Sequence, residues 1–185
     1  MIELRDDPAW GVHAIATFGP ELPAPGSPED QRLTTRPGEV VLVLRASSGS
    51  VWLQTKEFYP DGIFRVPTGS LKQGEAPDEG YRRELAEETG VSPLPAAERL
   101  ARISYRRNRS LLPFESYLYL VRGIDVQPSP SDPGERISGW RLTPAADLAA
   151  VARELRGLGA QWGSWGVFRA VGHEVLLGVL PKAGR

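Results

Sequence analysis

The sequence of 185 residues contains no cysteine and only two histidines. The lack of cysteine excludes disulfides, thiol nucleophiles and thiolate metal sites. It does not indicate whether the protein works in an oxidising or a reducing compartment. His13 and His173 have no partner at the spacing of metal ligands, so we interpret both as structural residues. A metal site in this chain would therefore have to use oxygen ligands.

The sequence also lacks an excess of charge of either sign. Its formal net charge is −1 and its pI is near 6.2, so it has no overall attraction to nucleic acids or anionic membranes. The N-terminus has no signal-peptide pattern, and no apolar run reaches the length of a membrane span. We expect a cytoplasmic protein with no membrane or nucleic-acid partner. The length indicates one domain over residues 1–185, with a core from about residue 10 to residue 180.

The most informative stretch covers residues 69–91, GSLKQGEAPDEGYRRELAEETGV. Pro77 suits the first position of a helix, and Asp78 and Glu79 place negative charge at the positive end of the helix dipole. Gly90 is a helix stop signal. The pattern predicts a loop followed by a helix from Pro77 to about Gly90.

Three glutamates of this helix, Glu84, Glu87 and Glu88, fall within about 100° of arc on one side. They repel one another, and two of them stand in the last turn, where the helix dipole disfavours anions. A bound divalent cation would compensate for this, and oxygen-only ligands indicate Mg²⁺ or Mn²⁺. The alternative is a solvated acidic face without a ligand.

The stretch resembles the Nudix signature, in which Gly, five residues, Glu, seven residues, Arg-Glu, an aliphatic, any residue, Glu-Glu, any residue, Gly and an aliphatic follow one another. All these positions are filled, from Gly69 to Val91. The seven fixed residues would match by chance about once in 10⁸ starting points, which favours the metal site over the solvated face. The resemblance implies an α/β protein with the Nudix fold, an α/β/α sandwich around a mixed β-sheet. It also implies hydrolysis of a phosphoanhydride bond.

The resemblance also implies roles for individual residues. Glu84, Glu87 and Glu88 would be metal ligands and catalytic residues, with the main-chain carbonyl of Gly69 as a further ligand. One of these glutamates could also be the general base, but some Nudix enzymes take the base from outside the signature, so we do not assign it. Arg83 would orient the site by pairing bidentately with a carboxylate such as Glu75.

One departure from the family precedes the signature. Thr68 stands where many Nudix enzymes have glycine, and we expect it to change substrate preference at most.

Outside the helix, several charged residues are candidates for substrate binding. Glu115 and Glu135 could supply a further metal ligand or base, although most glutamates are simply solvated. The cationic candidates could contact substrate phosphates, or they could simply be exposed to water in a loop or at a hairpin tip. They are Lys72 in the signature loop and Arg106, Arg107 and Arg109 in one later loop.

The rest of the chain predicts a sheet with helices on both faces. Apolar runs and turn signals predict strands, with 39–45 buried on both faces, and Thr143 and Pro144 open a helix. The Pro/Gly-rich residues 19–38 are interpreted as a surface loop. The predicted strands are 12–18, 39–45, 51–57, 63–67, 98–105, 116–122 and 136–142, and the predicted later helices are 144–156 and 161–180.

The leading functional hypothesis is a Mg²⁺- or Mn²⁺-dependent hydrolase that cleaves a nucleoside diphosphate linked to another moiety, such as a nucleoside triphosphate, ADP-ribose or another nucleotide sugar. The alternative is a sensor that binds such a nucleotide without cleaving it. An RNA cap hydrolase would need a basic track that the sequence does not show. The resemblance to the family also suggests a homodimer, which the sequence alone does not establish.

Overall fold

The computed structural model describes residues 1–19, 22–130, 132–159 and 161–180. Its described part contains one sheet in the order β1-β2-β6-β7-β3-β4-β8, with β5 paired to β3. The β2–β6 and β3–β7 pairs are parallel, and the other pairs are antiparallel. The strands are β1 (Ile2–Asp7), β2 (Gly11–Phe18), β3 (Gly38–Arg45), β4 (Val51–Lys56), β5 (Thr68–Ser70), β6 (Ala97–Arg107), β7 (Ser110–Arg122) and β8 (Ile137–Thr143).

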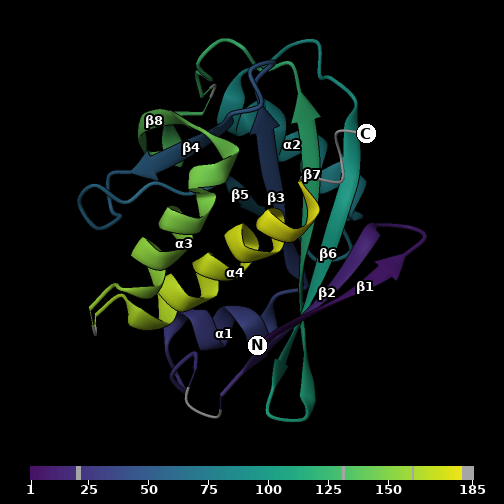
Figure 1. Ribbon diagram of the computed structural model, residues 1–185, viewed down its shortest axis with the longest axis vertical. Coiled ribbons are helices and arrows are strands. Elements are labelled where there is room, and N and C mark those ends of the chain that lie inside the picture. The colour runs from purple at the N-terminus through teal and green to yellow at the C-terminus, as the bar shows by residue number, and fades with distance from the viewer. Residues whose placement is uncertain (20–21, 131, 160, 181–185) are drawn as a thin grey trace.

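Helices cover both faces of this sheet, as Figure 1 shows. One face packs against α1, α3 and α4, and the opposite face packs against α2. None of the helices in the described ranges is long and apolar enough to cross a membrane. The mixed sheet between helical layers confirms the predicted α/β/α sandwich. The helices are α1 (Pro28–Thr35), α2 (Pro77–Thr89), α3 (Leu148–Arg156) and α4 (Gly163–Val179), with 3₁₀ turns η1 (Pro133–Glu135) and η2 (Ala145–Asp147).

The central strand β3 explains the run of apolar residues in its sequence. Val41 and Val43 point to the face covered by α1, α3 and α4, whereas Val40 and Leu42 point to the α2 face. Because successive side chains alternate between faces, a strand between two helical layers needs apolar residues throughout. Burial of this strand on both faces was predicted, and it is confirmed.

The prediction of a loop over residues 19–38 was wrong for its second half, which contains α1. Ser27 caps this helix by accepting a hydrogen bond from the Asp30 amide at 3.1 Å, and Pro28 occupies its first turn. Leu33 is the one buried residue of this helix. A single anchoring apolar residue gives no periodic signal, which is why composition suggested a loop.

Other differences concern strand boundaries. β1 was not predicted, because its exposed acidic and basic residues resemble a polar tail. Residues 63–67 do not form the predicted strand and contain only an isolated β-bridge between Gln54 and Arg65. The strand that pairs with β3 is made by the residues that follow, β5. β6 and β7 extend through most of the predicted loop 106–115. After Thr143 the chain forms η2 first and enters α3 only at Leu148.

Candidate active site

The helix of the signature stretch forms as its sequence predicts. α2 starts at Pro77, and the side chain of Glu79 accepts a hydrogen bond from the Ala76 amide at 3.2 Å. Gly90 ends the helix in the left-handed conformation at φ 63°, which glycine adopts without steric cost. Tyr81 and Leu85 of this helix pack against the sheet.

Gly69, in β5, lies directly against Glu84 of α2. A Cβ atom built on Gly69 would come 1.8 Å from Glu84 Cδ, so only glycine leaves room for this carboxylate. Gly80 has a similar role on the same helix, since a Cβ there would come 2.3 Å from Leu71 Cδ2. The two glycines let α2 and the signature loop pack closely.

Arg83 connects the loop to the acidic residues of the helix. Its Nε and Nη2 each donate to Glu75 at 2.9 Å, which confirms the predicted bidentate pair. Its Nη1 donates to Glu84 at 2.7 Å and to Glu87 at 3.0 Å, and Nη2 also donates to the carbonyl of Ser70 at 3.0 Å. The guanidinium lowers the pKa of Glu75 to about 2. Arg83 therefore positions two carboxylates of α2 while Glu75 orients Arg83 itself.

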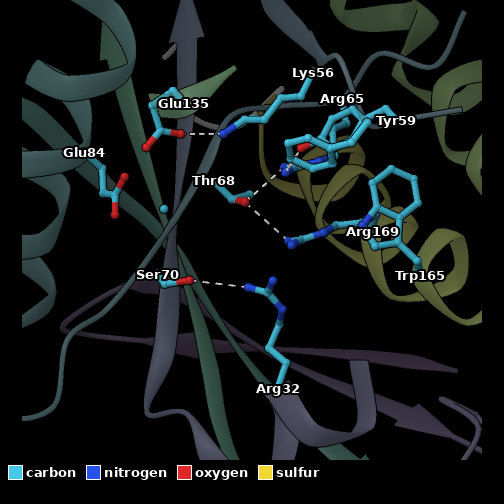
Figure 2. A pocket seen from close by; sticks show the side chains of 12 residues that line it. Arg32, Lys56, Tyr59, Arg65, Thr68, Ser70, Glu84, Glu135, Trp165 and Arg169 are labelled. Atoms are coloured by element: carbon cyan, nitrogen blue, oxygen red, sulfur yellow. Dashed lines mark hydrogen bonds and ion pairs between the residues drawn. The ribbon is translucent and has the colours of Figure 1, made fainter. Parts of the chain in front are cut away.

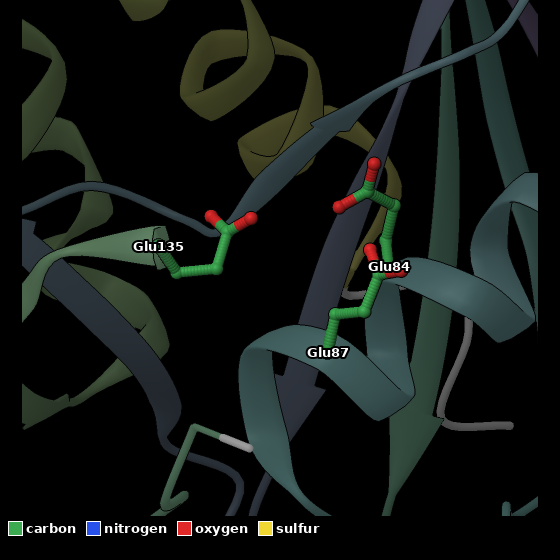
Figure 3. Close-up of side chains that lie close together, drawn as sticks. All are labelled: Glu84, Glu87 and Glu135. Carbon is green, nitrogen blue, oxygen red and sulfur yellow. The ribbon is translucent and has the colours of Figure 1, made fainter. Parts of the chain in front are cut away.

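Glu84, Glu87 and Glu135 form an acidic cluster. One carboxylate oxygen from each lies within 4.8 Å of the others, and Figure 3 shows the two glutamates of α2 facing Glu135 of η1 across a gap. Burial raises the pKa of Glu84, although Arg83 counteracts this. Of the two glutamates proposed outside the signature, Glu135 is the one that joins the cluster. Three carboxylates at this separation fit the oxygen ligand set of a divalent cation.

Glu88 lies beside this cluster with its carboxylate turned toward β4. Its Oε1 accepts hydrogen bonds from Gln54 Nε2 and Lys56 Nζ, both at 3.2 Å. Lys56 Nζ also contacts Glu135 Oε2 at 2.5 Å. Glu88 is fully buried, its Oε2 has no hydrogen-bond partner among the described residues, and burial raises its pKa to about 7. A buried carboxylate oxygen with no partner among the described residues, lying beside the cluster, also fits a ligand of a divalent cation.

Lys56 was not identified from the sequence, where it stands alone at the end of a strand. Burial alone would lower its pKa, but the carboxylates of Glu88 and Glu135 outweigh this and raise it. Its one sequence signal is rarity, since the chain contains only three lysines.

The remaining substrate-binding candidates lie elsewhere. Glu115 accepts hydrogen bonds from Ser104 at 2.6 Å and Tyr117 at 2.7 Å, and it is not part of the acidic cluster. The predicted basic loop is instead the end of the β6–β7 hairpin, where Arg107 pairs with Asp30 of α1. A cavity lies beside the acidic cluster, and five of the predicted substrate-binding residues do not line it. They are Lys72, Arg106, Arg107, Arg109 and Glu115.

That cavity, of about 290 Å³, has Glu84 and Glu135 at one end. Arg32 of α1, Arg65 and Arg169 of α4 line the other end, and Figure 2 shows their guanidinium groups converging there. Sequence reasoning missed these arginines because they come from three separate segments and match no local motif.

The sequence of the domain identifies the family. A family model described as NUDIX domain matches residues 35–162, which is more than half of the chain. The chain belongs to the Nudix family. Together with the complete Nudix signature, this makes it a pyrophosphohydrolase that acts on nucleoside diphosphate derivatives.

Several solved structures are similar to this chain. DR0079 from Deinococcus radiodurans is 25% identical, with a TM-score of 0.50 over 72% of this chain and 82% of that chain. The NUDIX domain of Shewanella oneidensis NrtR, solved with ADP-ribose, is 18% identical, with a TM-score of 0.47 over 82% and 94% of the two chains. A MutT NUDIX hydrolase from Burkholderia pseudomallei is 18% identical, with a TM-score of 0.47 over 60% and 85%. Comparison with curated proteins gives no match.

Proposed function

We propose that this Nudix hydrolase uses Mg²⁺ or Mn²⁺ to cleave a phosphoanhydride bond in a nucleotide. The observation that supports this is the acidic cluster of Glu84, Glu87 and Glu135, whose oxygens lie within 4.8 Å of one another. All ligand atoms there are carboxylate oxygens, which select hard divalent cations.

The proposed ligands are the three carboxylates of the cluster, with the carbonyl of Gly69 and the neighbouring Glu88 as further donors. A bound divalent cation would neutralise phosphate charge and make water a better nucleophile near neutral pH. Arg83 orients Glu84 and Glu87 through hydrogen bonds of 2.7 and 3.0 Å, so both carboxylates are positioned before substrate arrives.

The same residues favour catalysis over binding without turnover. A sensor could lose glutamates of the signature without losing nucleotide affinity, whereas here Glu84, Glu87 and Glu88 are all present. Burial and the contact with Arg83 also fix Glu84 in one position, which is what a reaction needs more than recognition does.

The test is release of phosphate and nucleotide from a panel of nucleoside triphosphates, dinucleoside polyphosphates, ADP-ribose, ADP-glucose and NAD. Each assay is run with Mg²⁺, with Mn²⁺ and with EDTA, for the wild type, Glu84→Gln and the matched surface variant Glu98→Gln. We expect metal-dependent turnover that Glu84→Gln loses and Glu98→Gln keeps. A folded wild type that binds a nucleotide and cleaves none would contradict the proposal in favour of a sensor.

A further inference from the structure

Arg32 lines the cavity without a carboxylate partner. Among the described residues its guanidinium makes one hydrogen bond, to Ser70 Oγ at 3.4 Å, and no ion pair. Burial lowers its pKa to about 10, and the nearby charge of Arg169 acts in the same direction. A cation in such surroundings weakens the fold unless an anion reaches it.

Two more arginines beside it are almost completely buried, with 4% of Arg65 and 7% of Arg169 exposed. Arg169 donates to Glu39 at 2.7 Å. Arg65 donates to the carbonyl of Val66 at 2.8 Å and contacts no carboxylate in the described part of the chain. The Nε atoms of Arg65 and Arg169 both lack a hydrogen-bond partner among the described residues.

The charges at this end of the cavity do not balance. Arg32, Arg65 and Arg169 bring three positive charges, and the buried carboxylate of Glu39, which pairs with Arg169, neutralises one. Buried charges are costly unless they are paired, so an excess of two cations indicates an anionic ligand. Because guanidinium groups bind phosphate well, phosphate is the anion that this site fits best.

The position of these arginines relative to the acidic cluster indicates which phosphates they would bind. Figure 2 shows Glu84 and Glu135 on one side of the cavity and the three guanidinium groups on the other. If the bond that is cleaved lies at the carboxylates, the arginines contact the part of the substrate beyond that bond. A cavity of about 290 Å³ is at the small end of ligand sites and suits phosphates better than a whole nucleoside.

We propose that Arg32, Arg65 and Arg169 bind phosphate groups beyond the cleaved bond, so that the preferred substrates contain three or more linked phosphates. Nucleoside triphosphates and dinucleoside polyphosphates meet this requirement. ADP-ribose and nucleotide sugars have two phosphates, so only one phosphate lies beyond the bond, and a sugar follows it. The proposal rests on the proposed function for the location of the cleaved bond.

Thr68 is a positioning residue for these arginines. Its Oγ1 accepts hydrogen bonds from Arg65 at 3.0 Å and from Arg169 at 3.3 Å, so one hydroxyl fixes both guanidinium groups. A glycine, which many Nudix enzymes have at this position, could not do this. Thr68→Val keeps the shape but removes the acceptor, and Thr68→Ser keeps the acceptor. We expect Thr68→Val to raise KM for triphosphates with little change in kcat, and Thr68→Ser to restore the KM.

The direct test is calorimetric binding of inorganic pyrophosphate to metal-free protein in EDTA. We expect the wild type to bind, and Arg32→Gln to bind roughly 10- to 100-fold more weakly because it loses one charged hydrogen-bond donor. Arg153→Gln removes the same charge from the exposed surface of α3 and should bind like the wild type. Arg32→Gln should fold normally, since Arg32 makes no ion pair among the described residues, and thermal unfolding checks this.

Three results would overturn the proposal: no pyrophosphate binding by the wild type, equal binding by Arg32→Gln, or equal loss in Arg32→Gln and Arg153→Gln. These outcomes do not depend on turnover, because no metal is present. If pyrophosphate binds as expected but nothing in the nucleotide panel is hydrolysed, the proposed function fails and the anion site stands. If nucleotides are hydrolysed and pyrophosphate is not bound, only the anion site fails.

Discussion

Lys56 lies between two carboxylates of the site, with Nζ 3.2 Å from Glu88 Oε1 and 2.5 Å from Glu135 Oε2. The ammonium therefore contacts one carboxylate oxygen of Glu135, which also belongs to the acidic cluster. A divalent cation that binds Glu135 has to share this carboxylate with Lys56. Glu88 limits the competition, because it provides Lys56 with a second negative partner.

Replacing Glu88 with glutamine should lower hydrolysis by about 10- to 100-fold. The amide cannot neutralise Lys56, so the lysine charge stays on Glu135, and the site loses one carboxylate next to the cation. The fold should persist with a change in unfolding free energy of no more than about 1–2 kcal/mol, because the glutamine can still accept from Lys56 and the cost of burying a carboxylate disappears. Metal-dependent turnover and thermal unfolding measure the two effects.

Glu98→Gln provides the matched control for Glu88→Gln, since Glu98 forms an exposed pair with Arg122 on the surface. It should keep wild-type turnover. A Glu88→Gln protein with wild-type turnover would show that Glu88 is not needed at the site.

Arg83→Lys should lower kcat by about 100-fold, because a lysine has one ammonium where Arg83 contacts Glu75, Glu84 and Glu87 at once. The neighbouring Arg82 is exposed, and Arg82→Lys is the control for the change of side chain. Steady-state kinetics of the two variants should differ mainly in kcat. Equal activity would mean that the three contacts of Arg83 do not orient the carboxylates.

The parts of the site that could be predicted from sequence are those coded within one short stretch. Helix α2, its stop at Gly90 and the pairing of Arg83 with Glu75 depend on neighbours at fixed offsets, so their spacing carries the information. The strand β3 was equally clear, because burial on both faces leaves a continuous apolar run.

The parts that could not be predicted depend on contacts between distant segments. Lys56 meets Glu88 only because β4 lies beside the α2 face, and Arg32, Arg65 and Arg169 converge from three separate segments. Helix α1 was missed as well, and with it the position of Arg32. A single sequence contains no signal that brings such residues together.

Gly69→Ala should abolish most activity while the protein stays folded. The new Cβ would lie 1.8 Å from Glu84 Cδ, and the end of a glutamate side chain can rotate away, so the carboxylate leaves the cluster and the backbone stays. A displacement of about 1 Å can cost about 100-fold in rate. Gly172→Ala in α4 has open space around the new methyl group and should keep activity. Turnover assays of both variants measure the loss of activity, and thermal unfolding checks that both are folded. An active Gly69→Ala protein would contradict the position of Glu84.

The last prediction concerns stability against acid and depends on His173, whose side chain is fully buried. Its Nε2 accepts a hydrogen bond from the Val66 amide at 3.2 Å, and its Nδ1 lies 3.1 Å from the carbonyl of Arg169. Both contacts fit the neutral ring, with the proton on Nδ1. Burial, with smaller effects from Arg65 and Arg169, lowers its pKa from 6.5 to about 4.

Between pH 6.5 and about 4 the unfolded chain binds a proton on His173 that the folded chain does not. The stability from the neutral ring is therefore complete above pH 6.5 and decreases as pH falls through this window, by about 3 kcal/mol in total. We expect His173→Gln to reduce the loss of unfolding free energy on acidification, even if the variant is less stable at pH 7. His13→Gln, at a partly buried histidine, is the control and should keep most of the wild-type pH dependence. Urea unfolding at pH 7, 6, 5 and 4 compares the three proteins, and parallel curves for the wild type and His173→Gln would show that this histidine does not cause the acid sensitivity.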